Sequence, residues 1–180
     1  MTPPLVPPSE LTRMVKARPL PAGAVVIEAS DTERAALAAR FGLVAVESLR
    51  AEVALEQKPS AIRATGRLRA AILQPCAVSG DELPVTIDEP IDLRFVEQHQ
   101  RPVPDEAAVE IELEADDCDE IAFTGDMFDL GEAVAQTLGL AMDPYIEGPN
   151  ADAVRAAAGI VLEGEQLGPL ADLLAGLKKG

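Results

Sequence analysis

Residues 62–96, IRATGRLRAAILQPCAVSGDELPVTIDEPIDLRFV, predict strand segments on either side of a turn. At the start of this stretch the even positions are small or apolar, whereas the odd positions are polar and mostly cationic. Because side chains alternate between the two faces of a strand, one face can pack on a core while the other exposes arginines. The exposed set is Arg63, Thr65, Arg67 and Arg69. The turn is predicted at 79–81, and Pro90 predicts a bend or bulge between two later runs at 83–87 and 91–95.

Alternating or short apolar runs elsewhere predict further strands, and two capping-box spacings predict helices. We expect strands at 24–29, 49–55, 109–113 and 121–123, helices at 31–41 and 130–140, and a short amphipathic helix at 169–178. Short turns between consecutive strands favour antiparallel pairing. The predicted fold class is therefore α+β: a twisted antiparallel β-sheet, open or curled into a barrel-like meander, with two or three helices packed on its apolar face.

The distribution of prolines and apolar residues predicts three parts. Residues 1–21 are expected to form an extended, Pro-rich N-terminal arm, in which 11–17 can add an edge strand. Residues 22–145 are expected to form a single α+β domain, and residues 146–180 a C-terminal extension with the short helix. The predicted core residues are Val26, Leu37, Phe41, Val53, Leu68, Ile72, Val85, Leu93, Phe95, Ile111, Leu113, Leu130, Val134 and Leu138.

Composition narrows the possible functions. The 180 residues are 48% hydrophobic, enough to bury a real core. Only 3% are aromatic and there is no Trp, which argues against aromatic stacking platforms for single-stranded nucleic acid. The sequence shows no charged-then-apolar leader and no long apolar run, so we expect a cytoplasmic protein that neither is secreted nor spans a membrane.

Charge is distributed unevenly along the chain. The formal net charge of −16 argues against nucleic-acid binding. However, residues 1–75 hold 10 cations and 7 acids, a net of +3, whereas residues 76–180 hold 5 cations and 24 acids, a net of −19. This asymmetry fits either different partners for the two halves or simple solvation of the acidic half.

No pattern in the sequence predicts a catalytic residue, a metal site or a cofactor. Cys76, Cys118 and His99 lack the ligand spacing of a zinc site, which favours structural or incidental cysteines. The acidic turn at 116–120 lacks the glycine of a calcium loop, which favours a solvated turn over a cation site. The single histidine has no nucleophile at a motif spacing, and no glycine-rich phosphate loop is present. We therefore expect a protein that is not an enzyme and needs no cofactor.

Two charged strand faces are the candidate binding surfaces. Arginines on a rigid strand suit bidentate contacts with RNA phosphates, although they can equally pair with acids across the sheet. The arginines are Arg63, Arg67 and Arg69, and the acids that could neutralise them are Glu52, Glu56 and Asp88. The second surface is acidic and suits a basic protein partner; it comprises Glu110, Glu112, Glu114, Asp116 and Asp117.

Several segments together resemble a known family. They are 29–43 (ASDTERAALAARFGL), 65–95 with its Gln-x-Cys core, 128–145 (FDLGEAVAQTLGLAMDPY) and the tail PLADLLAGLKK. In their order and spacing these resemble alphaproteobacterial-type members of the YceD family, the large ribosomal RNA subunit accumulation proteins. Many members of that family have a Cys-x-x-Cys pair at the strand end, but here the first of those cysteines is replaced by Leu73.

The resemblance implies a bacterial ribosome-biogenesis role, without enzymatic activity, in the accumulation of 23S rRNA. Three hypotheses follow. The protein contacts precursor large-subunit rRNA through the arginines, or it holds a basic ribosomal protein on its acidic face, or it is a metal-dependent nuclease, the least favoured of the three.

Overall fold

The computed structural model describes residues 9–98 and 120–160, and these fall into two compact units. The first unit comprises residues 1–74 and 84–143, and the second comprises 75–83 and 144–180. The predicted helix at 169–178 and the predicted strand at 109–113 lie outside the described residues. None of the helices in the described part of the chain is long and apolar enough to cross a membrane.

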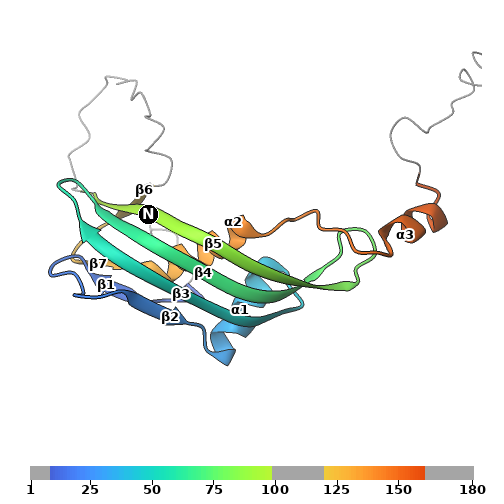
Figure 1. The fold of residues 1–180 in the computed structure, drawn as a ribbon, viewed down its shortest axis with the longest axis horizontal. Coiled ribbons are helices and arrows are strands. Elements are labelled where there is room, and N and C mark those ends of the chain that lie inside the picture. The colour runs from blue at the N-terminus through green and yellow to red at the C-terminus, as the bar shows by residue number, and fades with distance from the viewer. Residues whose placement is uncertain (1–8, 99–119, 161–180) are drawn as a thin grey trace, which may run out of the picture. The chain divides into compact units, whose positions relative to one another are not determined.

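A five-stranded sheet is the main element of the first unit (Figure 1). The order across the sheet is β2-β3-β4-β5-β6. These strands are β2 (Val25–Glu28), β3 (Ala45–Gln57), β4 (Ile62–Pro75), β5 (Glu82–Glu97) and β6 (Glu120–Phe123). In the described residues β2 and β6 are its two edges, so the sheet is open rather than a barrel, and the α+β fold class is confirmed.

The expectation of antiparallel pairing holds for only part of this sheet. β2 pairs antiparallel with β3, and β3 pairs antiparallel with β4, but β5 and β6 are parallel. A parallel pair needs a connection of about a dozen residues or more, and residues 98–119 provide one. The two runs predicted around Pro90 belong to one strand, β5, in which Ile87, Ile91 and Phe95 stay buried on either side of the proline.

The alternation predicted for residues 62–72 is confirmed in β4. The even residues Ile62, Ala64, Leu68, Ala70 and Ile72 are buried, whereas the odd residues from Arg63 to Arg69 are exposed. In β3 the same alternation is shifted by a bulge between Val46 and Ser48. One face of the sheet is therefore apolar and the other polar, and these are called the inner and outer faces below.

Two helices lie on the inner face (Figure 1). α1 (Asp31–Phe41) begins at the predicted capping box of Ser30 and Glu33 and ends at Gly42, whose φ of 65° favours glycine. α2 (Leu130–Ala141) begins at Asp129, whose side chain accepts a hydrogen bond from the Glu132 N–H. Both predicted helices are thus confirmed. Their buried side chains, Leu37 from α1 and Leu130, Val134 and Leu138 from α2, form one core with the inner face of the sheet.

One predicted core residue is wrong. Val26 is 49% exposed, whereas its neighbour Ile27 is fully buried. The register explains the difference, because Ile27 lies opposite the buried Ala51 whereas Val26 lies opposite Glu52 on the outer face. Phe41, Val85 and Leu93 are only partly buried against the core, and Ile111 and Leu113 lie outside the described residues.

Residues 9–16 are fixed to the helices. β1 (Met14–Lys16) pairs antiparallel with β7 (Met127–Asp129), so the predicted strand forms a separate two-stranded sheet instead of extending the main one. Leu11 is fully buried, and a Cβ at Gly131 would lie 2.2 Å from the Leu11 carbonyl oxygen. The Arg40 guanidinium pairs with Glu132 at 2.8 Å, and Ser9 donates a hydrogen bond to that same carboxylate. The described part of the arm is therefore packed against the domain.

Candidate functional site: the arginine face

The predicted arginines lie together on the outer face of β4, on the side of the sheet opposite the helices. Arg63, Arg67 and Arg69 are all exposed, as the alternation predicts, and β3 contributes Arg50 to the same face. We call these four residues the arginine face. Because β3 and β4 are long, paired over most of their length and packed on the core, they hold the arginines at fixed spacings.

Two of these arginines are already paired with acids of β5. Arg63 contacts Asp92 through two nitrogens at 2.9 and 2.6 Å, and the Arg67 Nε lies 2.5 Å from Asp88. These hydrogen bonds lower the pKa of Asp88 and of Asp92, and the bond to Asp88 raises the pKa of Arg67. The acids predicted to pair with these arginines were Glu52, Glu56 and Asp88, and of these three only Asp88 forms such a hydrogen bond. Asp92, the partner of Arg63, was not predicted. Exposed pairs of this kind are largely screened by solvent, so they orient the guanidiniums more than they stabilise the fold.

Arg69 and Arg50 differ from these pairs because they lie directly opposite each other across β3 and β4. Arg69 is 71% exposed, and its Nε lies 3.6 Å from Asp88, which Arg67 already engages. Arg50 forms an ion pair with Glu28 on β2. Like charges at directly opposite positions are destabilising, so the fold itself gains nothing from this arrangement.

Arg50 was not among the residues predicted from the sequence. It alternates with apolar residues in the predicted strand 49–55, which indicates an outward side chain. Its position opposite Arg69 depends on the register of the hairpin, which the sequence pattern alone does not give.

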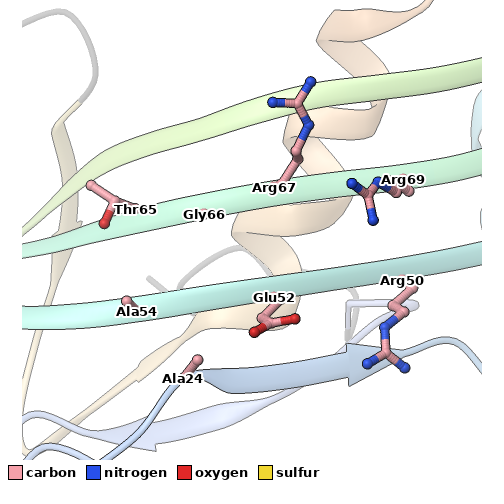
Figure 2. A pocket seen from close by; sticks show the side chains of 8 residues that line it. All are labelled: Ala24, Arg50, Glu52, Ala54, Thr65, Gly66, Arg67 and Arg69. Carbon is pink, nitrogen blue, oxygen red and sulfur yellow. The ribbon is translucent and has the colours of Figure 1, made fainter.

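Two open hollows lie between these side chains and share Arg50 and Arg69. The first has a volume of about 330 Å³, and Figure 2 shows the side chains around it. Its lining residues are Ala24, Arg50, Glu52, Ala54, Thr65, Gly66, Arg67 and Arg69. The second has a volume of about 460 Å³ and is also lined by Arg34 of α1. The small side chains of Ala24 and Ala54 leave the first hollow open.

Gly66 is required by the close approach of the two strands. A Cβ at this position would lie 2.0 Å from the Glu52 carbonyl oxygen and 2.9 Å from the Val53 Cα. Both neighbours are backbone atoms, which cannot turn aside as a side chain can. We call the first hollow the Gly66 hollow.

The second predicted surface lies outside the described residues. This applies to Glu110, Glu112, Glu114, Asp116 and Asp117, and also to His99 and Cys118. Among residues 9–98 and 120–160, no group of three or more His, Cys, Asp or Glu side chains is placed to hold a metal ion.

Cys76 lies in the second unit, in the turn between β4 and β5. It is a free, buried cysteine whose sulfur accepts hydrogen bonds from the backbone N–H groups of Ser79 at 3.3 Å and Gly148 at 3.2 Å. Hydrogen bonding from Ser79, reinforced by Gly148, lowers the pKa of the Cys76 thiol to about 6. The turn is closed by Asp81, which accepts hydrogen bonds from the side chains of Ser79 and Asn150. These contacts give Cys76 a structural role in joining 75–83 to 144–150.

Comparison with known proteins gives one match. A search of curated proteins and a search of solved structures returned no match to the chain. The family model described as large ribosomal RNA subunit accumulation protein YceD matches residues 64–168, which are 105 of the 180 residues. The match begins within β4 and includes Arg67 and Arg69, β5 and α2. The chain therefore belongs to the YceD family, whose name implies a role in the accumulation of large-subunit ribosomal RNA.

Proposed function

We propose that this protein is a non-enzymatic ribosome-biogenesis factor that contacts precursor 23S rRNA through the arginine face. Family membership supports the ribosomal role, and the arginine face supplies the type of side chain that binds RNA phosphates. The face belongs to the part of the chain with a net charge of +3, which moderates the repulsion expected from the overall charge of −16.

The opposition of Arg50 and Arg69 is the observation on which the proposal rests. Each guanidinium presents several N–H donors in a plane, and a phosphate placed between two of them can accept hydrogen bonds from both. The bound anion would also remove the repulsion that the two cations have in the free protein. Arg50, Arg63 and Arg67 each have a close acidic partner, so Arg69, which is 71% exposed and 3.6 Å from Asp88, is the least neutralised arginine of the face.

The proposal is tested by measuring the affinity for precursor large-subunit rRNA over a range of salt concentrations. We expect the double variant Arg50→Ala/Arg69→Ala to bind more weakly at low salt. Its plot of log affinity against log salt should be shallower by about 1.4–1.8, as expected for the loss of two phosphate contacts.

Arg18→Ala is the matched control, because Arg18 and Arg69 are both 71% exposed and each has one acidic neighbour, Glu97 or Asp88. The control should bind like the wild-type protein. Equal affinity and equal salt dependence for the wild-type protein and the double variant would refute the proposal.

The second candidate function is that of an acidic holder for a basic ribosomal protein. It is favoured by the net charge of −19 on residues 76–180, and its candidate surface comprises the acids at 110–117. A pull-down distinguishes the two. Precursor rRNA that stays bound after protein partners are removed supports RNA contact, whereas a basic ribosomal protein that survives nuclease treatment supports the holder.

A further inference from the structure

Among the described residues, the Glu52 carboxylate has no bonded partner, although it lies on the same face as the arginines. It lies directly opposite Arg67, and it lines the Gly66 hollow together with Arg50 and Arg69. Arg67 nevertheless bonds Asp88, and Arg50 bonds Glu28. In the part of the chain that the structure describes, the Glu52 carboxylate and the Thr65 hydroxyl, which both line the hollow, form no side-chain hydrogen bond or ion pair. In Figure 2 the Glu52 carboxylate points toward β2, whereas the Arg67 side chain points away from it toward β5.

A carboxylate beside arginines restricts which ligands can bind the hollow. The arginines favour an anion, whereas an ionised carboxylate only accepts hydrogen bonds and repels phosphate. A ligand that satisfies both has a phosphate at one end and two adjacent N–H donors at the other. Among the RNA bases, guanine presents two adjacent donors, N1–H and the 2-amino group, on its Watson–Crick edge. Adenine, cytosine and uracil each present only one donor group on that edge, so they cannot bond both carboxylate oxygens through two adjacent donors.

From this we infer that the Gly66 hollow binds one unpaired guanosine of single-stranded RNA, with Glu52 bonded to the base edge and the phosphate near Arg50 and Arg69. This inference rests on the proposed function and adds a base preference to it. Thr65 supplies a further hydroxyl to the lining, and the small side chains of Ala24 and Ala54 leave room for the base.

The size and lining of the hollow favour a single strand over a duplex. Its volume of about 330 Å³ is at the lower end of the range of roughly 300–1,000 Å³ found for small-ligand sites. Sequence-specific RNA recognition mostly uses unpaired bases whose Watson–Crick edge is free. No aromatic side chain lines the hollow, so the preference must come from hydrogen bonding, with stacking limited to the arginine planes.

The test uses labelled single-stranded uridine RNAs of about ten nucleotides that differ at one central position, measured by fluorescence anisotropy at low salt. The central residue is guanosine, inosine, adenosine or uridine, and each RNA is also measured as a duplex. Inosine is the matched control for guanosine because it keeps N1–H and lacks the 2-amino group. We expect guanosine to bind about tenfold more tightly than adenosine, inosine to be intermediate, and the preference to disappear in the duplex.

The variant Glu52→Gln separates this inference from a general electrostatic effect. Removing a negative charge beside the phosphates should tighten the binding of every RNA if the face is only electrostatic. We expect instead that Glu52→Gln weakens binding of the guanosine RNA and abolishes its advantage. Ala54→Leu fills the hollow while keeping all charges, and should reduce the same advantage. Both positions are exposed, so thermal unfolding should show both variants folded.

Two results would overturn the inference. The first is equal binding of the four RNAs by the wild-type protein. The second is tighter binding of the guanosine RNA by Glu52→Gln than by the wild-type protein. Either result would leave the proposed function intact. If the wild-type protein binds neither these RNAs nor precursor rRNA, then the proposed function fails as well.

Discussion

Replacing Gly66 by Ala tests the geometry on which the arginine face depends. The added Cβ would lie 2.0 Å from the Glu52 carbonyl oxygen, whereas real Cβ contacts are essentially never shorter than 3.0 Å. The backbone of β3 would therefore have to move by about 1 Å. Overpacking of this kind costs about 1–3 kcal/mol, and each ladder hydrogen bond that weakens adds up to about 1 kcal/mol. We expect Gly66→Ala to lower the free energy of unfolding by about 2–4 kcal/mol.

The measurement is urea unfolding of the full chain, followed by circular dichroism. Gly23→Ala is the matched control, because a Cβ at Gly23 has no heavy atom within 4 Å. The control should be unchanged or more stable by up to about 1 kcal/mol, since alanine restricts the unfolded chain. A Gly66→Ala protein as stable as the Gly23→Ala protein would show that the strands do not approach as described.

Three further predictions concern single side chains. Arg69→Ala should leave the free energy of unfolding unchanged or raise it by up to about 1 kcal/mol, because it removes a like-charge pair; a loss larger than that would refute this reasoning. Hydrogen bonds from Arg40 and Ser9 hold the pKa of Glu132 at about 2. The free energy of unfolding of the wild type should therefore exceed that of Glu132→Gln by a constant amount above about pH 5, and this difference should shrink as pH falls toward 2. The lowered pKa of Cys76 predicts that the thiolate stabilises the fold most above about pH 8.5 and that this effect is lost as pH falls through about 6. The difference in free energy of unfolding between wild type and Cys76→Ala, measured in urea, should follow this pH dependence. Cys118 does not affect the difference because both proteins contain it. A difference that does not change with pH would contradict the stabilising role of the Cys76 thiolate.

Local patterns predicted the parts of the fold that depend on neighbouring residues. The capping box at Ser30 and the alternation of β4 each involve contacts within a few positions of the chain, so they can be read directly. The parallel pairing of β5 and β6 could not, because it depends on the path of residues between the two strands. Val26 was misplaced for a related reason: in a short apolar strand the pattern does not reveal which alternate residues face the core.

The candidate site was predicted in part. The exposure of Arg63, Arg67 and Arg69 follows from the period of a strand, but their partners do not. Arg63 and Arg67 lie opposite acids of β3, Glu56 and Glu52, yet they bond Asp92 and Asp88 of β5, a choice that the sequence pattern does not reveal. The position of Arg50 depends on a register that includes the bulge in β3.

The central claim is that the arginine face supports large-subunit rRNA accumulation, and it is tested most directly in cells that lack their own copy of the protein. The ratio of large- to small-subunit rRNA is measured after expressing wild type, Arg50→Ala/Arg69→Ala or Arg18→Ala at equal protein levels. We expect wild type and Arg18→Ala to restore the ratio and the double variant to leave it low. Full restoration by the double variant would contradict the claim.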